Sequence, residues 1–226
     1  MTDRLRLVIF DVDGTLVDSQ LDILAAMTRA FDGAGLPVPD RDAILGIVGL
    51  SLDAAMLRLV PDQPQDARRD LVERYKQGFM QRRAQLGAGH APLYPGATDV
   101  LRQLAQDPFT LLGVATGKSR RGLDQLVSAH GWEQTFVTRQ VADDHPSKPH
   151  PSMILEAMAQ TGVEPADTVM IGDTQFDMEM AAAAGVAGIG VSWGYHPTTA
   201  LGAARRVIDR FEQLPAALQD IWMTAQ

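Results

Sequence analysis

Two pairs of aspartates have the spacing that could place their carboxylates in a catalytic or metal-binding site. The first pair, Asp11 and Asp13, directly follows a short apolar run and belongs to the sequence Asp11-Val-Asp13-Gly14-Thr15. Side chains at positions i and i+2 of an extended backbone point to the same side of it. Two carboxylates placed in this way can bind one hard cation, or can divide the roles of nucleophile and acid–base group.

A β-hairpin is the alternative explanation of this first pair. Asp-Gly between apolar runs is typical of a type I′ turn. The return strand of such a hairpin would be Thr15-Leu16-Val17, which is short, and the next residues, Asp18-Ser19, indicate the start of a helix. The sequence therefore favours a functional acid pair over a hairpin at this position.

The second pair, Asp173 and Asp177, comes at the end of another apolar run. A four-residue spacing puts both carboxylates on the same face of a helix, although N-capping by Asp173 is a simpler explanation of that residue alone. Four carboxylates gathered at strand ends would repel one another unless a cation lay among them. The chain has no cysteine and no cluster of histidines, so its oxygen ligands favour Mg²⁺ over zinc.

Two further segments could bind a phosphate group. Thr116-Gly117-Lys118 ends a predicted strand, where a hydroxyl and the N–H groups of a helix start suit phosphate oxygens. It lacks the earlier glycine that a Walker A motif requires. Lys148 is flanked by Pro149 and Pro151, which restrict the backbone and favour a helix from about Ser152. This loop could therefore hold a lysine in a fixed position at the site.

A possible serine nucleophile is rejected. Gly190-Val-Ser192-Trp-Gly194 matches the nucleophile elbow of serine hydrolases. The catalytic triad of that fold needs an acid and then a histidine after the serine. His196 is the only later histidine, and it precedes Asp209 and Asp220. Because this order cannot complete the triad, we interpret the glycines as a turn.

The composition excludes several classes of protein. The chain has 226 residues, 46% hydrophobic and 21% charged, with 20 basic and 28 acidic side chains and a formal net charge of −8. This balance argues against a nucleic-acid-binding protein, which needs a basic face, and the lack of cysteine excludes thiol nucleophiles. Ala181–Gly194 is too short to span a membrane, and the first residues do not resemble a signal peptide. We therefore expect a cytoplasmic protein with no nucleic-acid or membrane partner.

Short apolar runs alternate with stretches of helical periodicity, which predicts a parallel sheet covered by helices. Continuous apolar runs are typical of strands that are buried on both faces of the sheet. The predicted strands are Leu5–Phe10, Thr110–Ala115, Thr135–Thr138, Thr168–Ile171 and Val186–Val191, with an edge strand at Arg206–Ile208. The predicted helices between and after them are Ser119–His130, Ser152–Thr161 and Gln175–Ala184, with a last helix from about Glu212.

One long stretch interrupts this alternation. It contains four helical patterns and no convincing strand, and the patterns are Leu21–Phe31, Asp42–Ile47, Leu52–Leu59 and Gln65–Gln85. Turn-prone residues at Gly87-Ala-Gly89, Pro92 and Pro95-Gly96 bound it. Its roughly 70 residues far exceed an ordinary connection between a strand and a helix. The sequence therefore predicts an all-helical insert at residues 18–91 and a core formed by residues 1–17 and 92–226.

Taken together, the motifs resemble those of the haloacid dehalogenase superfamily, in particular its phosphatases with a helical cap after the first strand. The resemblance covers the whole chain and rests on Asp11-Val-Asp13-Gly-Thr-Leu, Ala115-Thr116-Gly117, Lys148-Pro and Gly172-Asp173-Thr-Gln-Phe-Asp177. It implies an α/β fold in which a Rossmann-like, doubly wound parallel sheet carries an inserted all-helical cap. The motifs and the cap are most similar to those of phosphoglycolate phosphatases and their relatives.

The resemblance also implies roles for the acids that follow the first and fourth predicted strands. Asp11 would attack phosphorus and form an aspartyl-phosphate. Asp13 would protonate the leaving alcohol and then activate the water that hydrolyses this intermediate. Mg²⁺ would be held by Asp11, the backbone carbonyl of Asp13, and Asp173.

The remaining motif residues would hold the phosphoryl group. Thr116-Gly117 and Lys148 would bind the transferring oxygens, and Lys148 would also neutralise charge in the transition state. Asp177 would support the water shell of the metal or orient Lys148. The helical cap would close over the site, and Gly46–Ser51 with Arg58 is expected to face the leaving group.

Within the superfamily the sequence leaves several activities open. Dehalogenases lack an acid at the position of Asp13, so its presence favours phosphoryl chemistry. The expected reaction is Mg²⁺-dependent hydrolysis of a small phosphorylated metabolite, with phosphoglycolate the leading candidate and a nucleotidase, a pyrophosphatase or a β-phosphoglucomutase as alternatives. The mutases typically have an arginine after Gly-x-Ser, where this chain has Leu52 after Gly49-Leu-Ser51. A non-catalytic phosphoacceptor domain would be about half this length and would lack the insert.

Overall fold

Six parallel strands form one sheet in the computed structural model, which describes residues 4–87 and 91–224. The strands are β1 (Arg6–Phe10), β2 (Thr110–Thr116), β3 (Thr138–Val141), β4 (Thr168–Gly172), β5 (Ala187–Val191) and β6 (Arg206–Ile208). Their order is β3-β2-β1-β4-β5-β6, and every neighbouring pair is parallel. Strands are thus added first on one side of β1 and then on the other, which confirms the predicted doubly wound α/β sheet.

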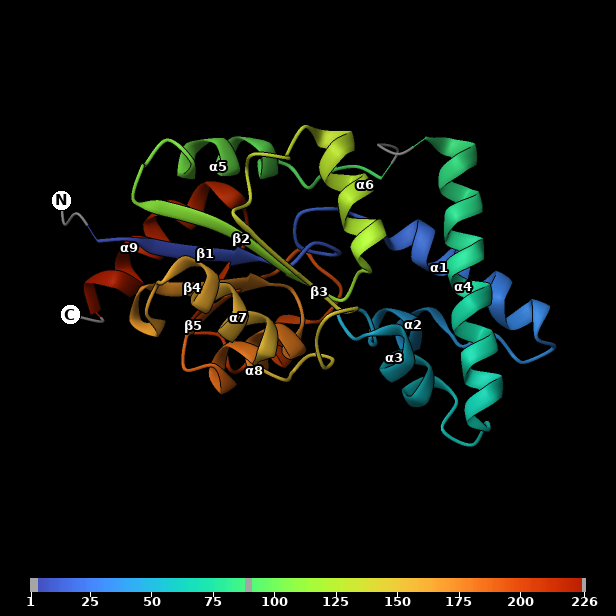
Figure 1. The fold of residues 1–226 in the computed structure, drawn as a ribbon. Coiled ribbons are helices and arrows are strands. Elements are labelled where there is room, and N and C mark those ends of the chain that lie inside the picture. Colours follow the sequence, from blue (N-terminus) through green and yellow to red (C-terminus); the bar gives the residue numbers. More distant parts are fainter. Residues whose placement is uncertain (1–3, 88–90, 225–226) are drawn as a thin grey trace.

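Helices cover both faces of this sheet (Figure 1). One face carries α5 (Ala97–Leu104), α6 (Arg120–His130) and α9 (Leu214–Thr224), and the other carries α7 (Ser152–Thr161) and α8 (Gln175–Ala183). Alternate residues of β1 supply the two apolar layers, because Val8 and Phe10 belong to the first cluster and Leu7 and Ile9 to the second. Short 3₁₀ helices lie at Pro165–Asp167, Thr198–Ala200 and Phe211–Gln213.

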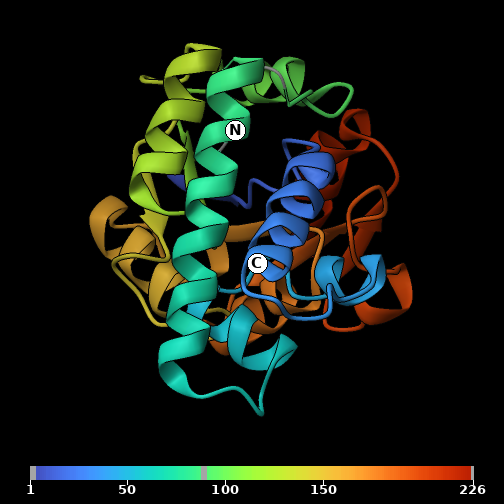
Figure 2. The same cartoon turned by 90° about the vertical axis from the view of Figure 1, so that its right-hand side faces the viewer.

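A helical insert separates β1 from β2. It consists of α1 (Gln20–Gly33), α2 (Arg41–Leu45), α3 (Leu52–Leu59) and α4 (Gln65–Leu86). Its buried apolar side chains form a cluster of their own, which includes Phe31, Met56 and Leu71. Figure 1 shows the insert beyond the carboxyl ends of the strands, and Figure 2 looks onto it, with α1 and α4 side by side. The chain limits of the insert at residues 18 and 91 stay a prediction, and part of the predicted turn at Gly87–Gly89 lies outside the described residues.

The third strand differs from its prediction. It was expected at Thr135–Thr138, but β3 begins at Thr138, whose partner on β2 is Gly113. The N–H of Thr135 donates to the carbonyl of Trp132 in a turn. Phe136 is buried in the core, so the apolar run here reflects the anchoring of a turn and not a strand.

Helix α5 was not predicted, and the last helix begins later than expected. The turn-prone Pro95-Gly96 directly precedes α5, and Gly96 adopts a φ of 84° as its N-cap. The start predicted near Glu212 falls in the 3₁₀ helix that leads into α9 at Leu214.

Among the residues that the structure describes, no helix combines the length and the apolar composition that a membrane span requires.

We predict that Leu71→Ala lowers the free energy of unfolding by about 2–5 kcal/mol, because it leaves a cavity in the cluster of the insert. Leu71 is fully buried there. Leu57→Ala is the matched control, since Leu57 is 52% exposed and such a surface change should stay within about 0.5 kcal/mol. Urea unfolding measures both. Equal effects of the two substitutions would contradict the described packing of the insert.

Candidate functional site

Three aspartates and a lysine from separate segments meet at the carboxyl end of the sheet. Asp11 follows β1, Asp173 follows β4, Asp177 lies in the first turn of α8, and Lys148 lies in the loop before α7. One oxygen from each carboxylate lies within 4.8 Å of those of the other two. All four side chains are buried. Because β1 and β4 are neighbours in the sheet, the fold brings together acids that are far apart in the sequence.

The ammonium of Lys148 joins two of these acids. Its Nζ donates to Asp11 Oδ1 at 2.8 Å and to Asp177 Oδ1 at 2.6 Å. Burial lowers the pKa of Lys148, but the charges of Asp11 and Asp177 and the hydrogen bonds that they accept outweigh it, so the pKa lies above its ordinary value. Lys148 is therefore held as a buried cation within the acid cluster.

One lysine does not balance three buried carboxylates. Burial raises the pKa of Asp11 to about 7, although Lys148 acts to lower it. Burial, and then the charges of Asp11 and Asp177, also raise the pKa of Asp173 well above its ordinary value. Asp11 Oδ2 is buried and has no hydrogen-bond partner among the described residues. A set of oxygen donors with excess negative charge and an unpartnered oxygen fits a divalent cation such as Mg²⁺.

Two hydrogen bonds and two closely packed glycines fix the orientation of Asp173. Thr15 Oγ1 donates to its Oδ1 at 2.9 Å, and the N–H of Tyr195 donates to its Oδ2 at 2.8 Å. A Cβ on Gly14, which has a φ of 89°, would lie 2.2 Å from Asp173 Oδ2. A Cβ on Gly194 would lie 2.1 Å from Asp173 Cβ. Only glycine at both positions lets the two loops approach this carboxylate.

The carboxylate of Asp13 has partners different from those of the other three acids. Its Oδ1 accepts hydrogen bonds from Ser19 Oγ and, at 2.8 Å, from Lys118 Nζ. The N–H of Ser19 donates to the hydroxyl of Tyr195 at 2.9 Å. The structure thus places Asp13 beside the acid cluster, where Ser19 and Lys118 hold its carboxylate.

The predicted phosphate-binding segment lies where the insert touches the core. The hydroxyl oxygen of Thr116 accepts from the N–H of Lys118 at 3.2 Å. A Cβ on Gly117 would lie 2.7 Å from the carbonyl oxygen of Leu50, so glycine is needed for this close approach of the insert. The N–H of Ser51 donates to Ser147 Oγ at 2.9 Å and adds a second contact between insert and core.

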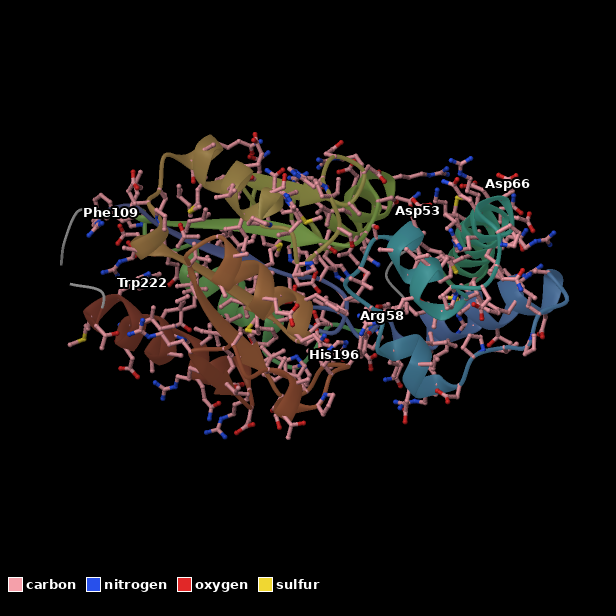
Figure 3. All side chains as sticks on the ribbon, turned by 90° about the horizontal axis from the view of Figure 1, so that it is seen from below. Asp53, Arg58, Asp66, Phe109, His196 and Trp222 are labelled. Atoms are coloured by element: carbon pink, nitrogen blue, oxygen red, sulfur yellow. The ribbon has the colours of Figure 1, made fainter. Side chains whose placement is uncertain are left out.

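A cavity of about 420 Å³ opens between the acids and the insert. Asp11, Asp13 and Thr116-Gly117 line its core end. Of the segment expected to face the leaving group, residues 47–50 line the cavity. Arg58 is exposed and is not part of that lining; its guanidinium lies 5.4 Å from the ring centroid of Phe176 on the core. Figure 3 shows Arg58 at the boundary between insert and core, and its expected contact with the leaving group stays a prediction.

Sequence reasoning missed three supporting residues, and the alternative explanation of Asp173 as a helix cap is ruled out. Ser19 was interpreted only as a helix start, but its side chain makes no capping bond to α1 and donates to Asp13. Lys118 was considered only as part of a phosphate-binding segment, and Tyr195 carried no local signal at all. Thr174, and not Asp173, caps α8, in a capping box with Asp177.

Comparison with known proteins places the chain in a family. A match to the haloacid dehalogenase-like hydrolase family extends over residues 8–191. The chain therefore belongs to this family of hydrolases.

Individual relatives cover nearly the whole chain. Over 215 residues the chain is 37% identical to the Dickeya dadantii protein named "Probable phosphatase IndB", covering 93% of this chain and 92% of that protein. Over 202 residues it is 33% identical to a phosphoglycolate phosphatase of Chromobacterium violaceum, covering 88% and 90% of the two chains. A solved haloacid dehalogenase-like hydrolase from Streptococcus pneumoniae is similar with a TM-score of 0.82 at 25% identity, covering 97% of this chain and all of that one.

We predict that Mg²⁺ raises the thermal unfolding midpoint of the protein and that Asp173→Asn removes most of this rise. A cation that binds only the folded state stabilises it by mass action, by about 2.7 kcal/mol at a hundred times its Kd. The amide keeps the shape of the side chain but removes the charge. Circular dichroism with and without Mg²⁺ measures the effect.

Asp53→Asn is the matched control for this measurement, because Asp53 is exposed on α3 (Figure 3) and is not one of the clustered acids. This variant should respond to Mg²⁺ as the unmodified protein does. A full Mg²⁺ response in the Asp173 variant would contradict the proposed cation site.

Proposed function

We propose that the protein is a Mg²⁺-dependent phosphomonoester hydrolase that acts through an aspartyl-phosphate on Asp11. The observation that carries this proposal is the buried cluster of Asp11, Asp173 and Asp177 around Lys148, in which Asp11 lines the core end of the cavity beneath the insert. Membership of the hydrolase family supports it, and both relatives described above are named as phosphatases.

In the first step, a carboxylate oxygen of Asp11 forms a bond to phosphorus while the ester bond from phosphorus to the alcohol oxygen breaks. Lys148 holds Asp11 in position through its 2.8 Å hydrogen bond. Asp13 gives its proton to the departing oxygen, so that a neutral alcohol leaves. Asp13 lines the cavity, which is where this alcohol would lie.

The second step regenerates the enzyme. A water molecule attacks phosphorus, and Asp13 takes its proton as the bond between phosphorus and Asp11 breaks. Inorganic phosphate is released and Asp11 returns to a carboxylate. Ser19 and Lys118 hold the carboxylate of Asp13, so the same group is positioned for both proton transfers.

The residues around Asp11 would handle the charge of the phosphoryl group. Mg²⁺ would be held by Asp11, Asp173 and the backbone carbonyl of Asp13, and when bound it would neutralise charge between nucleophile and phosphate. An ammonium has three N–H donors, and Lys148 gives two of them to Asp11 and Asp177, which leaves one for a phosphoryl oxygen. Asp177 would act by orienting Lys148, and Thr116-Gly117 would bind the remaining oxygens.

The substrate would be a small phosphorylated metabolite, and the insert would enclose its leaving group. Phosphoglycolate is the candidate that the motif resemblance and the name of the Chromobacterium violaceum relative support. The domain limits at residues 18–91, and the closing of this insert over the site, belong to the same proposal.

Asp11→Asn is expected to lower Mg²⁺-dependent phosphate release by at least about a thousandfold, because an amide is neither nucleophilic nor anionic and loss of a nucleophile costs orders of magnitude. Phosphate release from p-nitrophenyl phosphate measures the loss, and circular dichroism establishes that the variant is folded. Asp53→Asn again serves as the control with unchanged activity. Residual activity within about tenfold of the unmodified enzyme would contradict the role of Asp11.

The class of reaction is tested separately. Inorganic phosphate should be released from small phosphomonoesters, and no halide should be released from 2-haloacids, since an acid stands at position 13 to protonate an alcohol. Ion chromatography detects both products. Halide release would overturn the phosphatase proposal, and so would conversion of glucose 1-phosphate to glucose 6-phosphate without release of phosphate.

A further inference from the structure

The cavity beneath the insert has far more room than a two-carbon leaving group requires. Its volume of about 420 Å³ lies in the range of roughly 300–1,000 Å³ that encloses drug-sized ligands. A transferring phosphoryl group would occupy only the end near Asp11 and Thr116. Most of the volume is therefore available to the alcohol half of the substrate.

Much of the inner wall that the insert supplies to the cavity is apolar. It includes buried side chains from α1, α3 and the loop between α2 and α3, namely Ile23, Met27, Ile47, Val48 and Ala55. These side chains offer no hydrogen bonds to hydroxyl or carboxylate groups. Burying such groups without partners costs free energy, so these walls are a poor match for a carboxylate or an unsubstituted sugar.

Two aromatic side chains, one turn apart on α4, line the same cavity. Tyr75 and Phe79 are both half-buried, and their ring centroids lie 6.0 Å apart with planes tilted by 35°. Lys118 Nζ lies 5.2 Å from the Phe79 ring centroid and 2.8 Å from Asp13 Oδ1. In the proposed mechanism, Asp13 protonates the leaving-group oxygen of the substrate. A group attached to that oxygen is therefore within reach of the two aromatic rings. Aromatic rings pair at centroid distances of about 4.5–7 Å.

The mouth of the cavity is polar and carries both signs of charge. Its exposed polar lining residues are Glu73, Lys76, Arg121, Gln125 and Asp143, and Met80 adds one exposed apolar side chain. A ligand with an apolar face and a polar edge could bury the face against the walls and keep the edge at this mouth.

We propose that the alcohol half of the preferred substrate carries a planar aromatic ring that packs against Tyr75 and Phe79. This inference rests on the proposed phosphatase function and extends it from the reaction to the class of substrate. The shared chemistry is a flat π surface, which either a carbocyclic ring or a nucleobase supplies. It ranks phosphoglycolate, which has no ring, below a ring-bearing ester.

Two matched pairs of esters test the proposal on the unmodified enzyme with Mg²⁺. They are 2-phenylethyl phosphate against ethyl phosphate, and uridine 5′-monophosphate against ribose 5-phosphate. Each pair releases primary alcohols of similar basicity, so the ratio of kcat/KM values reports contacts with the ring and not chemical reactivity. We expect a ratio of about tenfold or more in at least one pair, and the pair with the larger ratio distinguishes a carbocyclic ring from a nucleobase.

Ratios near one in both pairs would overturn the inference, as would phosphoglycolate being hydrolysed faster than every ring-bearing ester. These outcomes leave the proposed function standing, because phosphate is still released. Absence of phosphate release from every ester, phosphoglycolate included, would instead overturn the proposed function, and this inference would fall with it.

Replacing Phe79 tests whether the aromatic ring of the substrate binds where we propose. Phe79→Ala should reduce the ratio of the responding pair by at least about threefold, since it removes one aromatic contact. Leu57→Ala, on the exposed side of α3 and outside the cavity lining, should leave the ratio unchanged. If Phe79→Ala does not fold, Phe79→Leu removes the ring but keeps an apolar side chain. An unchanged ratio in a folded Phe79 variant would overturn the placement of the ring.

Discussion

The buried ammonium of Lys148, bonded to Asp11 and Asp177, is the interaction on which the arrangement of the site depends. It connects the end of β1, the loop before α7 and the first turn of α8. Taking a charged group out of water costs several kcal/mol, which only close and well-directed partners recover. The sheet order, with β1 beside β4, provides those partners at 2.8 and 2.6 Å.

Such close packing of charges is possible only because small residues surround them. A Cβ on Gly172 would lie 2.4 Å from Asp177 Cβ, and Gly14 and Gly194 leave similar room around Asp173. Gly117 plays the equivalent part between core and insert, against the carbonyl of Leu50. These glycines occupy strand ends and the loops that follow them, so the backbone itself forms much of the wall around the acids.

The sequence predicted the parts of this molecule that local patterns encode. Asp11, Asp173 and Asp177 were found because each follows an apolar strand at a short, fixed spacing, and the insert was found from its helical periodicity. Tyr195 could not be found in this way, since its contacts with Ser19 and Asp173 join distant segments. The start of β3 was misplaced because the apolar side chain of Phe136 anchors a turn in the core and does not belong to a strand. Helix α5 was missed because Pro95-Gly96 was interpreted as the boundary of the insert.

Tyr195 links the acids of the site to the insert. Its N–H bonds to Asp173, its hydroxyl accepts from the backbone of Ser19, whose side chain bonds to Asp13, and its ring packs on the apolar cluster of the insert. One residue, through its backbone N–H and its side chain, thus connects the two acids to the helices that cover them. A substitution in the insert that displaced this ring would act on Asp13 through the tyrosine hydroxyl and Ser19, without touching Asp13 itself.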